Sequence, residues 1–188
     1  LHQSTNWSRI MKDIFVYGLL IPKDKKCSVA KLNDYELVIA DSGHFSVVPK
    51  KGSCVYGVVF YVDEGTLSMY DFYEGYNPSD VEGSFYIRKE DARVELVRFN
   101  GDEFGGRVEV LDGTTYVDFY MQQNPFFESE RFEKCSGEVC DTRILNRFGF
   151  ACDVADSVER LAKEQGIPTE QYKIALGDYG FRLTKDVR

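Results

Sequence analysis

Short apolar runs dominate the first two thirds of the chain, and few segments there show a helical period. Residues 13–21 (DIFVYGLLI) form a continuous apolar run that Gly18 interrupts and Pro22 ends. Residues 54–62 (CVYGVVFYV) form the longest such run and are rich in β-branched and aromatic side chains. Runs of this length and composition are typical of buried strands. The pattern therefore predicts a strand over 13–21 that leads into a turn, and a central strand over 54–62.

Other segments predict shorter strands. Asp112-Gly113 separates the last two of them, and an Asp-Gly pair is a strong signal for a β-hairpin turn because glycine tolerates a positive φ. A further turn is expected within 101–106. The predicted shorter strands are 35–39, 45–48, 84–88, 92–99, 106–113 and 114–121.

Helical signals occur in two places. Asp63 precedes residues 64–74 (EGTLSMYDFYE), and Gly75 follows them. A short carboxylate satisfies the free N–H groups at a helix start, and glycine is common just after a helix end. We therefore predict a short helix over 64–74. Near the C-terminus, residues 154–165 predict an amphipathic helix, and a further helical start is expected at 169–170.

Together these elements predict an α+β fold. The expected sheet is curved, mixed and partly closed like a barrel, with few flanking helices and a partly helical C-terminal extension. Residues 1–11 are polar and irregular, and we expect a tag or a disordered N-terminal arm there. The sheet domain is expected over 12–121 and the extension over 122–188, with its amphipathic helix near 154–165.

Composition and charge exclude several classes of partner. The chain has 188 residues and a net charge of -8, which opposes binding to a phosphate backbone. No apolar run approaches the ~20 residues that span a bilayer. The five cysteines show no CxxC spacing, so we expect reduced thiols in a cytoplasmic protein and no metal. Pairing of Cys135 with Cys140 remains open. We expect no nucleic-acid partner and no membrane.

Candidate chemistry is concentrated around Glu74. Aromatic residues crowd this part of the chain, and ordinary core packing explains most such clusters. The functional alternative is an apolar cleft around one carboxylate. Glycine-rich phosphate motifs are absent, and a Cys54–His44 nucleophile pair is supported only by proximity in sequence. The aromatic residues concerned are Tyr70, Phe72, Tyr73, Tyr76, Phe85 and Tyr86.

Four short motifs, in their order along the chain, resemble the motifs of a known superfamily. The chain resembles the gamma-glutamylcyclotransferase-like superfamily, which includes the AIG2-like proteins and the gamma-glutamylamine cyclotransferases. The resemblance covers roughly residues 12–121, and the segment 115–117 (TYV) resembles the last barrel strand of that superfamily with its tyrosine. The four motifs are YGLL at 17–20, GVVFYV at 57–62, YDFYEG at 70–75 and YIR at 86–88.

The resemblance implies a cyclotransferase fold and activity without a cofactor. Such an enzyme converts a small-molecule γ-glutamyl amine, amino acid or peptide into 5-oxoproline and a free amine. Glu74 is implied as the general acid and base that moves the protons. The implied substrate-binding residues are Tyr17, Gly18, Leu19, Leu20, Tyr86 and Tyr116.

Two departures keep other hypotheses open. Leu19 stands where the family usually has Ser or Thr, and Tyr70 stands where it usually has Leu. A non-catalytic member that binds a small molecule or a protein is therefore the main alternative, followed by a different lyase, hydrolase or transferase. Arg88 is expected to be a structural ion-pair donor. The segment 122–188 matches no family pattern, so capping of the cleft, a homodimer contact and partner binding are all open for it.

Overall fold

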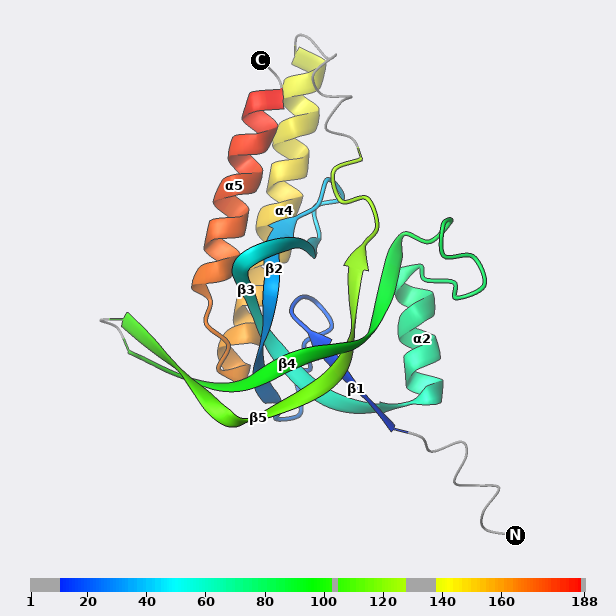
Figure 1. Ribbon diagram of the computed structural model, residues 1–188. Coiled ribbons are helices and arrows are strands. Elements are labelled where there is room, and N and C mark those ends of the chain that lie inside the picture. The colour runs from blue at the N-terminus through cyan, green and yellow to red at the C-terminus, as the bar shows by residue number, and fades with distance from the viewer. Residues whose placement is uncertain (1–10, 103–104, 128–137, 187–188) are drawn as a thin grey trace.

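The computed structural model describes residues 11–102, 105–127 and 138–186. Five strands form a closed barrel in the order β1-β3-β2-β4-β5. β1 (Met11–Val16) closes the ring, because it pairs antiparallel with β3 and parallel with β5 through Ile14 and Asp118. In Figure 1 the two C-terminal helices stand along one side of the barrel and α2 lies on the other. The predicted α+β class with a barrel-like sheet is confirmed.

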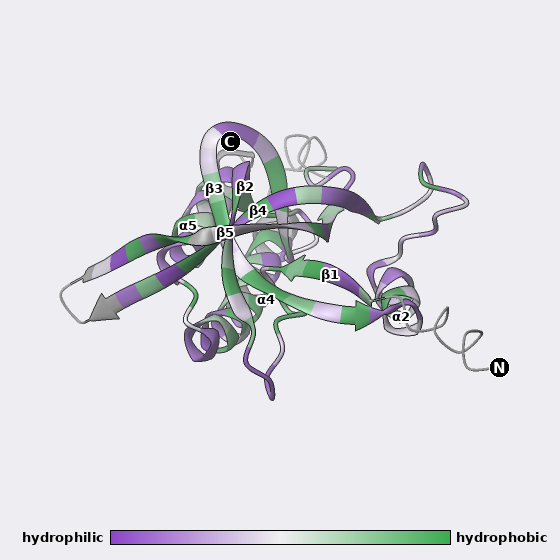
Figure 2. Ribbon diagram, turned by 60° about the horizontal axis from the view of Figure 1, so that its bottom comes forward, coloured by the Kyte–Doolittle hydropathy of each residue, from purple (hydrophilic) through white to green (hydrophobic). Residues whose placement is uncertain are grey.

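The barrel consists of long bent strands, where the sequence predicted several short ones. β2 (Ser28–Ile39) and β3 (Phe45–Asp63) form one hairpin, so the predicted strands 45–48 and 54–62 are parts of a single element. The polar residues 50–53 between them form a bulge, because the register shifts from Asn33 opposite Cys54 to Tyr35 opposite Pro49. Figure 2 shows hydrophobic and hydrophilic residues alternating along the projecting ends of β4 and β5.

The predicted hairpin turn at Asp112-Gly113 is wrong. β4 (Tyr86–Asp102) and β5 (Gly105–Gln122) pair as far as Asp102 and Gly105, so the chain reverses within the other expected turn. Asp112-Gly113 lies where the register shifts and β5 carries extra residues. Such a β-bulge bends a strand and also accommodates glycine, so the local signal did not distinguish a bulge from a turn.

The end of β1 is held closely against β3. A Cβ atom added at Gly57 would lie 2.3 Å from the carbonyl oxygen of Val16, so only glycine fits at this crossing. The close approach fixes the position of the last β1 residue. Tyr17 and the loop after it therefore leave the barrel at a defined point.

The helix α2 (Glu64–Glu74) has the boundaries that its sequence predicts. The Asp63 carboxylate accepts a hydrogen bond from the backbone N–H of Thr66 at 2.7 Å. Gly75 ends the helix in the left-handed conformation, with φ of 69°. Because both caps are local, the short sequence places Glu74 on the last turn of α2.

Two helices make up the described part of the C-terminal extension. α4 (Glu138–Gln165) begins well before the predicted residue 154, and α5 (Glu170–Asp186) extends the helical start expected at 169–170. Gly166 ends α4 with φ of 81°. Both helices bury a face that is continuous with the barrel core, including Val154, Val158 and Tyr172.

Two sequence-based expectations fall on residues that the structure does not describe. The N-terminal arm expected at 1–11 is one, apart from Met11, which begins β1. The pairing of Cys135 with Cys140 is the other. Cys27, Cys54 and Cys152 are free thiols. Within the described ranges, no helix is long and apolar enough to cross a bilayer.

Candidate active site

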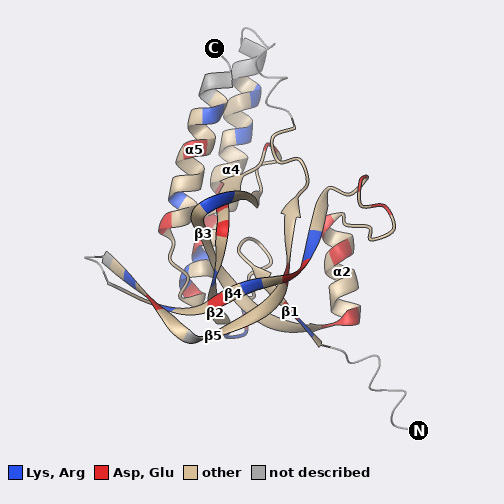
Figure 3. Ribbon diagram, in the orientation of Figure 1, with Lys and Arg blue, Asp and Glu red and all other residues tan. Residues whose placement is uncertain are grey.

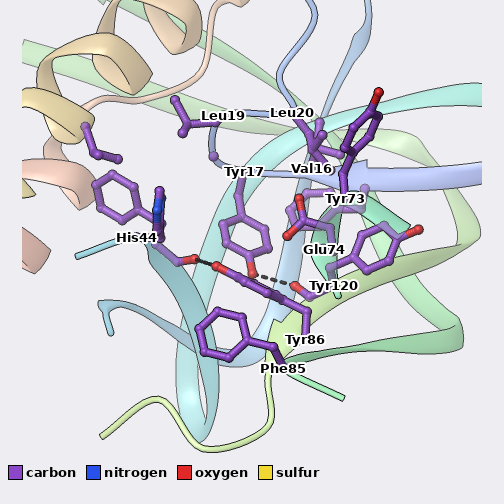
Figure 4. Close-up of a pocket in the computed structure, with 14 residues that line it drawn as sticks. Val16, Tyr17, Leu19, Leu20, His44, Tyr73, Glu74, Phe85, Tyr86 and Tyr120 are labelled. Carbon is purple, nitrogen blue, oxygen red and sulfur yellow. Dashed lines mark hydrogen bonds between the residues drawn. The ribbon is translucent and has the colours of Figure 1, made fainter. Parts of the chain in front are cut away.

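A cavity of about 250 Å³ opens between the end of β1, the end of α2 and the helix α4 (Figure 4). Its wall is mainly aromatic and aliphatic. Among the described residues that line it, Glu74 is the one carboxylic acid, and none is a lysine or an arginine. The lining residues are Phe15, Val16, Tyr17, Gly18, Leu19, Leu20, His44, Phe45, Tyr73, Glu74, Phe85, Tyr86, Tyr120 and Val154.

The structure brings the predicted site residues together, with one exception. Glu74, Tyr86 and the segment 17–20 all line the cavity. Tyr116 does not line it, and its side chain is 65% exposed. Tyr120, four residues further along β5, lines the cavity instead. Both tyrosines lie on the same face of β5, because residues four apart on a strand point the same way. The motif therefore identified the correct face of β5, and the packing around Tyr120 decides that this tyrosine is the buried one.

Burial changes the acidity of Glu74. Removal from water raises the pKa of Glu74 from 4.5 to about 7, because the charged carboxylate is disfavoured in an apolar wall. Phe72, which the sequence suggested as part of this wall, is 82% exposed and takes no part in it. Tyr73, Phe85 and Tyr86 provide the aromatic surface instead.

The raised pKa of Glu74 predicts a pH-dependent change in stability. Between pH 4.5 and about 7 the folded protein retains a proton that the unfolded chain has released, so stability falls as pH rises through this window. Glu74→Gln removes this titration, and we expect the variant to gain up to about 3 kcal/mol over wild type at pH 8. Urea unfolding at pH 4.5 and pH 8 measures the difference. An equal difference at both pH values would contradict the assignment.

Three buried tyrosines surround the carboxylate. Burial raises the pKa of Tyr17, Tyr86 and Tyr120, and the charge of Glu74 raises each of them further. Tyr17 donates its hydroxyl hydrogen to the carbonyl of Tyr120, and Tyr86 donates to the carbonyl of Phe45 at 2.9 Å. The hydroxyl groups are therefore neutral and fixed, whereas the Glu74 carboxyl exchanges a proton near neutral pH.

A tight turn lines the same cavity as Glu74. The N–H of Ile21 donates to the carbonyl of Gly18 at 3.1 Å, so Leu19 and Leu20 are the central residues of a β-turn. Among the described residues, the N–H groups of Gly18, Leu19 and Leu20 have no acceptor. Successive free N–H groups in a turn form a concave site for an anion or an oxyanion.

Gly18 is required neither by backbone strain nor by packing within the protein. It is absent from the residues with positive φ, and a Cβ added there would lie 3.8 Å from its nearest neighbour, Phe45. We expect Gly18→Ala to be as stable as wild type or more stable by about 0.4–1 kcal/mol. If substrate approaches this backbone, kcat/KM falls about tenfold because the methyl group narrows the cavity.

Thermal unfolding and steady-state kinetics of the Gly18→Ala variant test both parts of this prediction. Gly57→Ala is the control, because its Cβ clashes with Val16 and it should lose stability. Unchanged kinetics in Gly18→Ala would show that no ligand needs close approach to this residue.

A buried ion-pair network fixes α2 to the barrel behind the cavity. Arg88 on β4 donates to Asp71 of α2 at 2.9 Å and to Asp118 of β5 at 2.6 Å. Tyr120 donates its hydroxyl hydrogen to the same Asp71 at 2.6 Å. Figure 3 shows the basic segment of β4 beside α2, a helix with acidic residues and no lysine or arginine. Arg88 is thus a structural ion-pair donor, as the sequence suggested.

The other candidate groups form neither a nucleophile pair nor a metal site among the described residues. His44 lines the cavity, where its ring packs edge-on against Phe150 at 5.3 Å, and burial lowers its pKa. Cys54 does not line the cavity, so the pair with His44 is not assembled. The lysines that follow the turn after β1, at positions 23, 25 and 26, are exposed and do not line the cavity. The described residues contain no group of His, Cys, Asp or Glu suited to hold a metal.

The barrel and its family match define a cyclotransferase-like protein. A family model for gamma-glutamyl cyclotransferase, AIG2-like, matches residues 14–135. The chain belongs to this family. The match covers the barrel strands and ends before α4, so the described C-terminal helices lie outside it.

Solved structures support the fold at low sequence identity. One called gamma-glutamyl cyclotransferase has a TM-score of 0.54 at 17% identity, over 88% of this chain and 86% of that chain. The uncharacterized protein loc79017 from Homo sapiens has a TM-score of 0.51 at 17% identity, and the match covers the same shares of the two chains. YkqA from Bacillus subtilis has a TM-score of 0.55 at 16% identity, over 96% of this chain and 58% of that one. No curated protein sequence gives a significant match.

Proposed function

We propose that the protein is a cyclotransferase that converts a γ-glutamyl compound into 5-oxoproline and a free amine, with Glu74 moving the protons. The observation that carries the proposal is the shared cavity, which is lined by Glu74 and by residues 18–20, whose N–H groups have no acceptor among the described residues. Membership of the gamma-glutamyl cyclotransferase, AIG2-like family supports the same reaction class.

The acidity of Glu74 suits the first proton transfer. The α-amino group of a γ-glutamyl compound titrates near ~8, and an ordinary glutamate titrates near ~4.3. Transfer across that gap costs about 5 kcal/mol, out of a barrier of roughly 16 kcal/mol for a turnover of ~10 per second. With the pKa of Glu74 at about 7, the gap is close to one unit and the cost falls to about 1.4 kcal/mol.

The reaction proceeds by intramolecular attack. Glu74 takes a proton from the α-ammonium group, and the resulting amine attacks the γ-carbonyl carbon of the same molecule. The new C–N bond closes the five-membered ring and leaves negative charge on the former carbonyl oxygen. We expect the N–H groups of Leu19 and Leu20 to stabilise that charge. The original γ-C–N bond then breaks as Glu74 returns that proton to the leaving nitrogen. The ring nitrogen gives its second proton to the same carboxylate, which passes it to the released amine, so the products are the neutral lactam and an ammonium ion.

The departure at position 19 does not remove this chemistry. The turn offers backbone N–H groups, which do not depend on the side chain. Leu19 is 51% exposed at the cavity and replaces a hydroxyl contact with apolar surface. We therefore propose that Leu19 alters which substrates bind while the proton transfers stay with Glu74.

A substrate panel tests the proposal. The protein is incubated with γ-glutamyl amines, γ-glutamyl amino acids and a γ-glutamyl peptide, and released 5-oxoproline is quantified by mass spectrometry. We expect 5-oxoproline from at least one class. No product from any substrate, together with saturable binding of 5-oxoproline or a γ-glutamyl compound, would support the non-catalytic binding alternative. A protein that shows neither turnover nor binding would contradict the cyclotransferase proposal and the binding alternative alike.

A further inference from the structure

The C-terminal helices make specific polar contacts around the turn after β1. Gln171 in the first turn of α5 accepts a hydrogen bond from the Tyr56 N–H at 2.8 Å and donates to the Tyr56 carbonyl at 2.7 Å. One side-chain amide thus satisfies both backbone groups of a single residue on β3. This pattern mimics the pairing that another strand would provide.

Gln171 takes the hydrogen-bonding position on β3 that Gly18 would otherwise occupy. β1 and β3 pair in a register that ends with Val16 opposite Val58, so the next hydrogen-bonded position would set Gly18 opposite Tyr56. Because Gln171 takes both groups of Tyr56, Gly18 has no place in the ladder. The chain after Val16 can therefore leave the barrel and form the turn that lines the cavity.

Tyr172, the next residue of α5, fixes the orientation of the peptide unit that leads into the turn. Its hydroxyl donates to the carbonyl oxygen of Tyr17 at 2.7 Å, and its side chain is fully buried against Phe45. In a trans peptide unit the C=O and the following N–H point in opposite directions. Holding the Tyr17 carbonyl toward α5 thus turns the Gly18 N–H away from the helix.

A third side chain holds the far end of the same loop. Gln165, the last residue of α4, is 4% exposed. Its amide nitrogen donates to the carbonyls of Pro22 and Lys25 at 2.9 and 2.7 Å, and its amide oxygen accepts the Cys27 N–H at 3.0 Å. The segment between β1 and β2 is therefore held on both sides of the turn by these helices.

We propose that Gln171 and Tyr172 are positioning residues of the active site, and that they hold the turn at 18–20 off the sheet with its N–H groups open to the cavity. Neither residue lines the cavity, so they act through the backbone of Tyr17 and Gly18. The proposal rests on the proposed function for its kinetic consequences. It assigns a catalytic-site role to helices that lie outside the residues matched by the family model.

The variant Tyr172→Phe tests the proposal, because it removes the hydroxyl and keeps the buried ring. We expect kcat/KM to fall about tenfold for the substrate that the panel identifies, with the pH midpoint set by Glu74 unchanged. Tyr179→Phe is the matched control. Tyr179 is also fully buried on α5, lies about two turns further along and does not line the cavity, so its kinetics should equal wild type. Gln171→Met tests the Tyr56 pair separately and should act in the same direction.

An amide-resonance measurement keeps this test independent of turnover. In ¹⁵N-labelled protein, we expect Tyr172→Phe to shift the signals of Gly18 and Leu19 and to weaken 5-oxoproline binding, whereas Tyr179→Phe leaves both unchanged. A lower melting temperature with unchanged kinetics and unchanged amide signals would overturn the positioning role. If wild type neither turns over nor binds 5-oxoproline, the proposed function fails, and the amide signals alone decide the positioning role.

Discussion

Glu74→Gln is expected to abolish most turnover, with a loss of about 10²–10⁴-fold in kcat. The amide has nearly the shape of the carboxyl group but cannot accept the proton of the α-ammonium group or return one to the leaving nitrogen. Substrate binding should change little, because the turn and the aromatic wall remain. The loss should therefore appear in kcat, with KM within a few-fold of wild type.

A pH profile sharpens this test. Wild-type kcat/KM should rise with pH through an ionisation near the pKa of about 7, as the Glu74 carboxylate forms. Any residual activity of Glu74→Gln should lack that step. Glu64→Gln is the matched control, since Glu64 lies in the exposed first turn of the same helix and should leave both rate and profile unchanged. Full activity in Glu74→Gln would remove this residue from the mechanism.

Arg88→Leu is expected to cause the largest loss of stability, about 3–5 kcal/mol in the free energy of unfolding. The substitution leaves two carboxylates, Asp71 and Asp118, in a buried region without the guanidinium that bridges them. Asp118 is fully buried, and Lys12 at 3.4 Å is the one cationic partner that remains for it among the described residues. Chemical unfolding at pH 7 measures the effect.

A second ion pair on the same strand provides the control for Arg88→Leu. Arg98 lies 4.0 Å from Glu109, and both side chains are more than half exposed. Arg98→Leu should therefore change stability by less than about 1 kcal/mol. If Arg88→Leu does not fold, Arg88→Lys keeps the charge without the two-fold geometry and should show an intermediate loss. Equal effects of the Arg88 and Arg98 substitutions would contradict a structural role for the buried network.

The network also matters for the candidate active site. Asp71 belongs to the same helix as Glu74 and receives hydrogen bonds from Arg88 and Tyr120. The contact holds the last turn of α2 against the barrel and therefore fixes where Glu74 enters the cavity. A helix held only by its own propensity would leave this carboxyl in water, and the raised pKa depends on its burial.

The sequence by itself determined the parts of the site that depend on near neighbours. Asp63 and Gly75 set both ends of α2, so Glu74 was predictable as the last helical residue. The apolar run before Gly18 identified β1 and the turn after it. These signals are local because a cap or a turn is completed within a few residues.

Only the tertiary structure decided which of these residues share a cavity and what surrounds them. Tyr120 and not Tyr116 lines the site, since the Tyr120 hydroxyl bonds to Asp71 of α2 while Tyr116 is exposed. Asp112-Gly113 lies in a bulge because β4 and β5 pair on both sides of it. The contact of Tyr172 with Tyr17 joins residues far apart in the chain. Such pairings follow from the packing of whole elements, and no pattern within a few residues of either partner records them.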